Sequence, residues 1–323
     1  NVEYHARIVL QKHIAREIIR ISSEAINDAY DPTTDCFELL LRIEAEIASL
    51  TARNGSSIIN ATKAIIDTLS DKTKVEYLPQ PIHKLEEHVP GFFAMDFMLI
   101  NARPGVGKTS FALQVQYALA KQGYCTAFIS IEMPVEHLVN YMATQNANIP
   151  SLSLRTKEYT KDEELRIDAF IESLRVKELP FLLFVPENNR IESLLSTMRK
   201  MVAMGVKTFF IDYLQQLRTM KDGKPNEVME NVCMYLKEFC KREKVTVVAL
   251  SQLNADKTNT AGGDGAIRYA DASIWLYKSS EDPDTAECLP NSDESSEGYV
   301  TFEIKKNRNG GTGKVYLQFD GER

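Results

Sequence analysis

The sequence predicts an α/β fold with a mainly parallel sheet, preceded by an α-helical hairpin and a short linker helix. Two observations lead to this prediction. After residue 96, apolar stretches of strand length alternate with helical patterns, which is typical of parallel strands flanked by helices. Before that point, helical spacing of apolar residues runs to about residue 52 and again from Ile58 to Leu69.

The composition is that of an ordinary globular protein. With 323 residues, 44% of them hydrophobic, the chain suits one large or two ordinary domains and is not a disordered tail, a collagen or a disulfide miniprotein. Its formal charge of -7 means that contacts with nucleic acid must come from local basic loops. The five cysteines contain no CxxC pair, which supports neither a disulfide framework nor a zinc ribbon.

The sequence shows no signal for a membrane or for secretion. No apolar run approaches the roughly 20 residues of a membrane span, and the start from Asn1 to Tyr4 lacks the character of a signal peptide. We therefore expect a soluble, cytoplasmic protein. The chain begins without Met inside a predicted helix, so we also expect residues upstream of Asn1.

Residues 1–52 are the first predicted unit, a helical hairpin with its turn from Tyr30 to Asp35. Its two apolar stripes are Ile8, Ile14, Ile18, Ile21 and Ala25, and Phe37, Leu40, Leu41, Ile43 and Ile47. Residues 53–80 are a linker with a polar break, a cap at Ser56 and Ser57, and a short amphipathic helix. That helix packs either on its own chain or on a partner subunit.

Residues 81–323 are the third predicted unit and hold the sheet. Strands are predicted at 97–100, 125–131, 181–185, 208–211 and 245–250, with helices that begin near Thr109, Pro134, Asp162, Ile191 and Asn226. From Ser273 the pattern is that of antiparallel strands, at 273–277, 299–305 and 315–319. We expect the polar, acidic stretch from Ser279 to Gly298 to be a mobile excursion.

A phosphate-binding loop is predicted between the strand at 97–100 and the following helix. Its small residues let backbone N–H groups converge on phosphate oxygens, Lys108 adds a positive charge, and Thr109 can ligate Mg²⁺. Ala102 stands in place of the usual first glycine. The residues predicted to bind ATP or another nucleoside triphosphate are Arg103, Pro104, Gly105, Val106, Gly107, Lys108, Thr109, Ser110 and Asp212.

Two carboxylates follow predicted strands at the same edge of the sheet. Asp212 either holds Mg²⁺ through water beside Thr109 or caps the next turn. Glu132 precedes Pro134, which suits a helix start. Glu132 is either the base that activates the attacking water or an acid favoured by the helix dipole.

Three further polar residues are candidates. Gln252 ends a predicted strand, where it either senses the γ-phosphate or satisfies a buried loop. Lys306 and Arg308 are two residues apart, so a strand points both side chains the same way. They suit a triphosphate held by a neighbouring subunit, because they come from the opposite flank of the sheet from the phosphate loop. The alternative is a basic edge hairpin that its charge keeps soluble.

Together, five motifs resemble those of DnaB-type replicative helicases, which are hexameric, RecA-like P-loop motors that move along single-stranded DNA. The motifs are Ala102 to Thr109, Ser130-Ile131-Glu132-Met133, Ile211-Asp212-Tyr213-Leu214-Gln215, Ser251-Gln252-Leu253-Asn254 and Lys306-Asn307-Arg308-Asn309-Gly310. Tyr4 to Val9 and Ala29 to Pro32 are similar to the second half of that family's helical N-terminal domain, so 1–52 is its expected remnant. The resemblance covers nearly the whole chain.

The resemblance implies an ATP-dependent, Mg²⁺-requiring DNA helicase that forms a homohexamer, moves 5′ to 3′ and works with a primase and a helicase loader. The compartment implied is the bacterial cytoplasm, or the host cytoplasm if the protein is phage-encoded. The linker helix would dock on the adjacent subunit. The resemblance implies that Lys108, Thr109 and Asp212 bind the triphosphate and its metal ion, and that Glu132 is the general base. It implies that Gln252 links the γ-phosphate to the DNA loops. Lys306 and Arg308 would contact the nucleotide of the neighbouring subunit, with Arg308 as the arginine finger.

The expected DNA contacts depart from the family pattern. The family usually has an Arg-Glu-Ser-Gly run where this chain has residues 260–265, without the arginine. The remaining DNA-binding candidates are Gly262, Gly263, Asp264 and Gly265, through backbone N–H groups, and Lys221 and Lys224. Two rival functions stay open: a RecA-like ATPase without unwinding activity, and a catalytically weak ring that acts as a replication scaffold or loading platform.

Overall fold

The computed structural model describes residues 2–53, 61–72, 77–176, 178–220, 223–253, 265–282 and 298–319. Contacts divide the chain into two compact units, Asn1–Val75 and Glu76–Arg323. The predicted boundary after residue 80 differs from this division, because β1 (Tyr77–Pro79) pairs antiparallel with β2 (Gly91–Phe93) in the second unit. Strands of three residues are too short to give a periodic sequence pattern.

The first unit contains the predicted helical hairpin, α1 (Val2–Ala29) and α2 (Cys36–Arg53), and α3 (Ala61–Ser70). The turn lies where it was predicted, and the Asp35 carboxylate accepts the backbone N–H of Phe37 at 2.8 Å, which satisfies the start of α2. Arg20 crosses from α1 to Glu46 of α2 at 3.0 Å. The expected stripes are confirmed only in part: Ile21 is buried, whereas Phe37 is exposed.

The linker helix lies partly where it was predicted. Its first residues, including the expected cap at Ser56 and Ser57 and the apolar Ile58, lie outside the described residues. Within α3, the side chains of Ile65, Ile66 and Leu69 are all more than half exposed.

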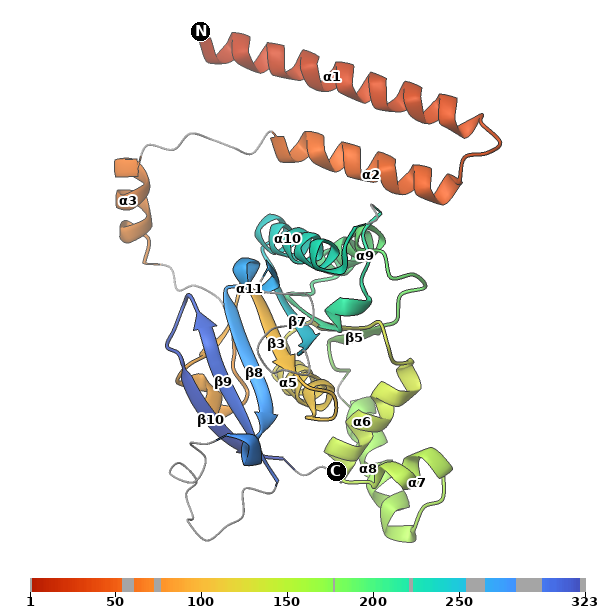
Figure 1. The fold of residues 1–323 in the computed structure, drawn as a ribbon, viewed down its shortest axis with the longest axis vertical. Helices are drawn as coiled ribbons and strands as arrows, with labels where there is room; N and C mark the ends of the chain where they lie inside the picture. The colour runs from red at the N-terminus through yellow and green to blue at the C-terminus, as the bar shows by residue number, and fades with distance from the viewer. Residues whose placement is uncertain are drawn as a thin grey trace. The chain divides into compact units, whose positions relative to one another are not determined.

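The second unit is built on one twisted sheet (Figure 1). In the described part of the chain the strand order is β10-β9-β8-β3-β7-β6-β4-β5, with six parallel strands followed by two antiparallel ones at one edge. The strands are β3 (Phe97–Ala102), β4 (Thr126–Ser130), β5 (Phe181–Phe184), β6 (Thr208–Asp212), β7 (Thr246–Gln252), β8 (Ala272–Lys278), β9 (Tyr299–Asn307) and β10 (Gly313–Gln318).

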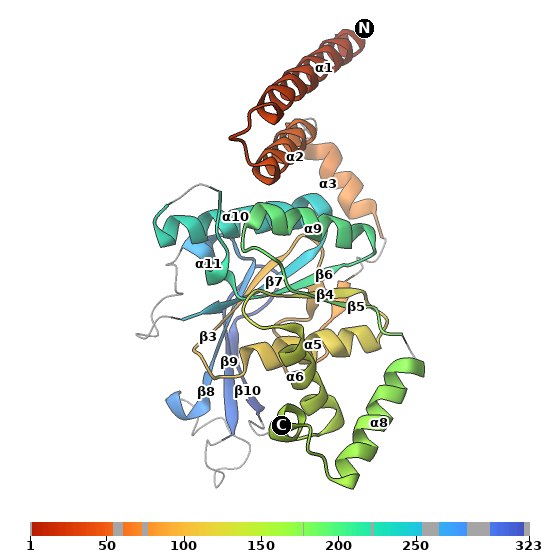
Figure 2. The same ribbon diagram turned by 90° about the vertical axis from the view of Figure 1, so that its right-hand side faces the viewer.

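Helices cover both faces of this sheet, with α9 and α10 on one face and α5 and α6 on the other (Figure 2). Side chains that alternate along β3 explain the two layers: Met98 and Ile100 pack with α5 and α6, whereas Phe97 and Leu99 pack with α9 and α10. The helices are α4 (His83–Glu86), α5 (Lys108–Lys121), α6 (Val135–Ala147), α7 (Ser151–Thr156), α8 (Lys161–Val176), α9 (Ile191–Ala203), α10 (Pro225–Glu243) and α11 (Gly265–Tyr269).

The predicted α/β fold is therefore confirmed, with one correction at the antiparallel edge. β8 was expected to begin the antiparallel group, but it pairs parallel with β3, so the direction reverses only between β8 and β9. The 3₁₀ turn η2 (Ser279–Glu281) follows β8, and residues 283–297 of the expected excursion lie outside the described residues. Among the described helices, none is both long and apolar enough to cross a membrane.

Candidate functional site

The phosphate loop lies between the end of β3 and the first turn of α5, as predicted. Gly105 and Gly107 have φ angles of 77° and 95°, a backbone conformation that glycine adopts without strain. A β-carbon at Gly107 would also lie 2.5 Å from the ring of Phe319. Val106 is buried and fixes the loop, while Pro104 and Gly105 are exposed. The exposed part of the loop faces outward at the N-terminus of a long helix, which favours anion binding.

Lys108 and Asp212 form a buried pair beneath the loop. Lys108 Nζ lies 3.9 Å from Asp212 Oδ1, and the two side chains are 10% and 3% exposed. Nζ also lies 5.0 Å from the centre of the Tyr213 ring. Burial lowers the pKa of Lys108, although Asp212 and Glu132 act to raise it, and burial raises the pKa of Asp212. Burial therefore disfavours the charged form of both side chains, which is common at functional sites.

Thr109 and Asp212 supply the oxygens that Mg²⁺ prefers. The Thr109 hydroxyl donates to Asp212 Oδ2 at 2.6 Å, because the C-terminal ends of β3 and β6 meet at the same edge of the sheet. Among the described residues, no cluster of three His, Cys, Asp or Glu side chains forms a metal site. A hydroxyl and a single carboxylate fit Mg²⁺, which commonly completes its shell with substrate phosphates and water.

Glu132 lies at the same edge, in the turn between β4 and α6. The Ser130 hydroxyl shapes this turn by donating to the Met133 carbonyl at 2.7 Å and accepting the Met133 N–H at 3.0 Å. The backbone N–H of Ile131 donates to the Asp212 carbonyl at 2.7 Å, which ties the turn to β6. Glu132 is exposed, and it is close enough to Lys108 to influence the pKa of that residue.

Gln252 ends β7 beside Ala102 of β3, but the side chain that bridges this edge belongs to Gln215. Gln215 Nε2 donates to Ser251 Oγ at 2.8 Å and to the Gln252 carbonyl at 3.1 Å. Its Oε1 accepts the Gln252 N–H at 3.2 Å. Gln215 therefore fixes the backbone at Gln252, a role that the sequence analysis did not assign.

Lys306 lies near the end of β9 and Arg308 follows that strand by one residue, and their side chains contact α11 and the residue before β8, respectively. Lys306 Nζ donates to the Ile267 carbonyl at 2.7 Å, and an Arg308 guanidinium nitrogen donates to Asp271 Oδ1 at 3.1 Å. Because Asn307 pairs with Ala272 at the start of β8, both cations lie at the edge of the sheet opposite to the phosphate loop.

The candidate DNA-binding residues are only partly described. Lys221, Gly262, Gly263 and Asp264 lie outside the described residues. Lys224 is exposed immediately before α10, and Gly265 opens α11 against Glu230 of α10.

Two contacts with the phosphate loop were not predicted from the sequence. Arg103 lies 3.4 Å from Glu281 Oε1 in η2, and Phe319 packs beside Gly107. Both partners come from the C-terminal part of the chain, more than 170 residues away, so local spacing gives no signal for them.

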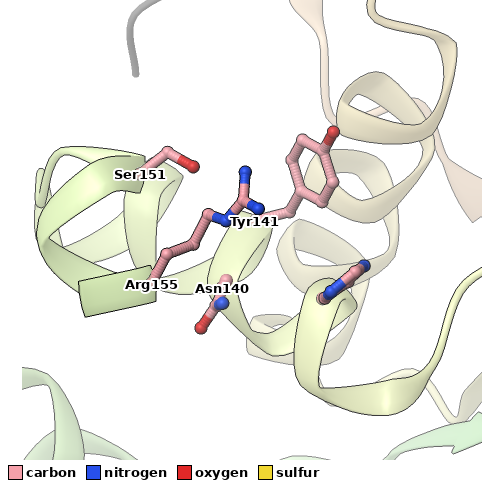
Figure 3. A pocket seen from close by; sticks show the side chains of 5 residues that line it. Asn140, Tyr141, Ser151 and Arg155 are labelled. Atoms are coloured by element: carbon pink, nitrogen blue, oxygen red, sulfur yellow. The ribbon is translucent and has the colours of Figure 1, made fainter. Parts of the chain in front are cut away.

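A separate pocket lies between α6 and α7. Its lining residues are His137, Asn140, Tyr141, Ser151 and Arg155, and the Arg155 side chain extends toward Tyr141 (Figure 3). It contains no residue of the phosphate loop, so it is not the predicted nucleotide site.

Comparisons with known proteins agree with this geometry. The replicative DNA helicase DnaC of Bacillus subtilis (strain 168) is 28% identical over 348 residues, covering 99% of this chain and 73% of that protein. The replicative DNA helicase DnaB of Haemophilus influenzae is 26% identical over 356 residues, with coverage of 100% and 73%.

Solved structures show the same fold. A structure described as a DnaB-like replicative helicase and its interactions with primase superposes with a TM-score of 0.76 at 20% identity, covering 99% of this chain and 77% of that one. A second solved structure, described as an ATPase domain, gives a TM-score of 0.68 at 20% identity, with coverage of 81% and 94%. The family model of the DnaB-like helicase C-terminal domain matches residues 78–323. The chain therefore belongs to the family of DnaB-like replicative helicases, and residues 78–323 are its RecA-like ATPase domain.

Proposed function

We propose that this protein is an ATP-dependent replicative DNA helicase that forms a hexameric ring and moves 5′ to 3′ on single-stranded DNA. The observation that carries the proposal is the position of Arg308. It lies beside the start of β3, whereas the phosphate loop follows the end of that strand. Five steps of about 3.3 Å along the strand separate the two ends by roughly 16 Å. An Arg308 that serves a phosphate loop must therefore serve that of another protomer.

Each residue of the site has a proposed part in this reaction. Lys108 and the loop amides hold the triphosphate, while Thr109 and Asp212 hold Mg²⁺, which neutralises charge on the phosphates. Glu132 accepts a proton from the attacking water. Arg308 of the adjacent protomer, with Lys306 beside it, stabilises the charge that develops on the transferred phosphoryl group, and such fingers contribute on the order of 10³ to 10⁵ in rate.

The same proposal covers the contacts with DNA and with partner proteins. Gln252 links the nucleotide site to the loops that face the ring channel, and the candidates in those loops are Lys221, Lys224 and the segment 262–265. A positive channel is compatible with the acidic overall charge, because only the lining has to bind the strand. We also propose that α3 docks on the adjacent subunit, that a primase and a loader are partners, and that the protein acts in the cytoplasm.

Unwinding of forked DNA tests this function. The purified protein should separate a fork with a 5′ single-stranded tail when ATP and Mg²⁺ are present, and a duplex with only a 3′ tail should stay intact. Lys108→Ala is the matched inactive control. Hydrolysis without strand separation would favour a RecA-like ATPase that does not unwind, and a Lys108→Ala variant that still supports replication would favour a scaffold.

A further inference from the structure

Asp271 is a buried carboxylate immediately before β8, and it lies outside the nucleotide site of its own protomer. Its side chain is 7% exposed. Oδ2 accepts the Phe97 backbone N–H at 2.8 Å and a hydrogen bond from Lys237, and Oδ1 accepts from Arg308 at 3.1 Å. Both oxygens are therefore used, and one of them holds the proposed arginine finger.

The backbone around Asp271 is as firmly held as the side chain. Its N–H donates to the Phe97 carbonyl at 2.7 Å, and its carbonyl accepts the Arg308 N–H at 2.9 Å. The residue thus joins the first residue of a central strand to the residue that follows β9. A group held on rigid strands in this way positions its partner more accurately than a group on a free loop.

Lys237 is a second positive partner of Asp271, beside Arg308. Its side chain, on α10, is 12% exposed, and Nζ also donates to the Met95 carbonyl at 2.9 Å. Asp271, Lys237 and Arg308 together carry a net charge of +1, and the Asp96 carboxylate also interacts electrostatically with all three. Arg308 is therefore oriented by a carboxylate whose charge Lys237 already compensates in part.

The Arg308 side chain also remains accessible. It is 54% exposed, and a guanidinium has five N–H donors in a fixed fork. One terminal nitrogen is engaged with Asp271, which leaves exposed guanidinium surface for a phosphate oxygen of another molecule.

Lys306, the second cation, is held by residues 267 and 268, shortly before Asp271 in the chain. Lys306 Nζ donates to the carbonyls of Ile267 and Arg268 at 2.7 and 3.3 Å, near the C-terminal end of α11, where a positive charge is favoured. Residues 267–271 therefore hold both Lys306 and Arg308 at one edge of the protomer.

We propose that Asp271, backed by Lys237, is the positioning residue that presents Arg308 to the nucleotide of the neighbouring protomer. The inference rests on the proposed function, in which Arg308 acts across the subunit interface. In this proposal Asp271 acts through Arg308, so it is a positioning residue and not a catalytic one.

Steady-state ATPase kinetics of Asp271→Asn test this role. Asparagine keeps the shape but removes the charge that orients Arg308, so we expect kcat to fall about 10²-fold, the effect of a misplaced catalytic group, while KM stays within about threefold. Adding Asp271→Asn to Arg308→Ala should cost less than about twofold more in kcat, because both changes act through one guanidinium. Independent, multiplying losses in the double variant would overturn the proposal.

Lys237→Met provides a second variant in case Asp271→Asn does not fold. It leaves Asp271 and Arg308 in place but lets Asp271 neutralise Arg308, so kcat should again fall at least about tenfold with little change in KM. Lys241→Met is the matched control, since Lys241 is an exposed lysine one turn later on α10, and its kcat should stay within about twofold. A Lys237→Met variant with the kcat of that control would contradict the proposal.

Mixed rings separate this inference from the proposed function. Asp271→Asn protomers keep an intact phosphate loop, and Lys108→Ala protomers keep an intact Arg308, so mixing the two should restore ATPase at mixed interfaces. Arg308→Ala mixed with Lys108→Ala is the reference. If ATPase activity recovers in the Arg308→Ala mixture but not in the Asp271→Asn mixture, only the role of Asp271 is rejected. If activity does not recover in the Arg308→Ala mixture, Arg308 does not act across subunits, and both proposals are rejected.

Discussion

The hydroxyl of Thr109 donates to the carboxylate of Asp212 at 2.6 Å, although 103 positions separate the two residues in the sequence. Their strands are not direct neighbours, since β7 lies between β3 and β6. The contact exists because both strands run parallel and end at the same edge, where the phosphate loop also begins. This arrangement fits the Mg²⁺ site that we propose at Thr109 and Asp212.

Asp212→Asn should weaken nucleotide binding in a Mg²⁺-dependent way. Asparagine keeps the size of the side chain but removes the charge beside the cation, and such changes near a metal typically cost about 10- to 100-fold in metal affinity. Calorimetric titration with a nonhydrolysable nucleotide should show this loss with Mg²⁺ and little loss with a chelator. An equal loss under both conditions would mean that Asp212 shapes the loop and does not bind the ion.

The stability of the nucleotide-free protein should depend on pH through Asp212. Burial raises the pKa of this carboxyl in the folded state, so its charge destabilises the fold above the folded pKa, and that cost disappears as pH falls toward the ordinary value. Asp212→Asn has no such titration. Thermal denaturation from about pH 7 to about pH 4 should therefore show the wild type gaining stability relative to the variant. If the wild type instead lost stability relative to Asp212→Asn as the pH falls, the pKa of Asp212 would not be raised in the folded state.

Gly107→Ala should destabilise the second unit more than Gly105→Ala does. Both glycines have positive φ angles, which cost alanine about 1–3 kcal/mol, but only at Gly107 would the new β-carbon meet the Phe319 ring, at 2.5 Å. Nothing lies within 4 Å of the corresponding position at Gly105. Thermal denaturation should show the larger loss for Gly107→Ala, and Phe319→Ala in the same chain should recover part of it. Equal losses at the two glycines would mean that the ring moves aside without cost.

The sequence predicted those parts of the site that depend on local order. The phosphate loop is encoded within eight consecutive residues, Asp212 is the last residue of β6, and Glu132 follows β4 by two residues. Parallel strands bring such positions to a common edge, so no knowledge of distant contacts was needed. The shared direction expected for Lys306 and Arg308 rested on the period of a strand, whereas the structure places Arg308 one residue beyond β9.

The remaining contacts depend on pairs that no local pattern reveals. Asp271 reaches Phe97 across 174 positions and Arg308 across 37, and Phe319 packs beside Gly107 from the far end of the chain. Gln252 is a candidate because it ends a strand, and the Gln215 side chain, which binds Ser251 and the Gln252 backbone, has no such local signal. In each case the partner is set by how the strands are ordered in the sheet, which amphipathic spacing does not determine.

Glu132→Gln decides between the two interpretations that the sequence left open. As the general base, Glu132 should contribute about 10²- to 10⁴-fold to kcat, and because it is exposed, its replacement should leave nucleotide affinity and stability nearly unchanged. As an acid that only favours the start of α6, it should contribute about 0.3–1 kcal/mol to stability and nothing to turnover. Single-turnover hydrolysis and thermal denaturation of Glu132→Gln separate these outcomes.

Glu136→Gln is the matched control, since Glu136 is exposed in the first turn of α6. Equal hydrolysis rates for the two variants would remove Glu132 from the catalytic residues.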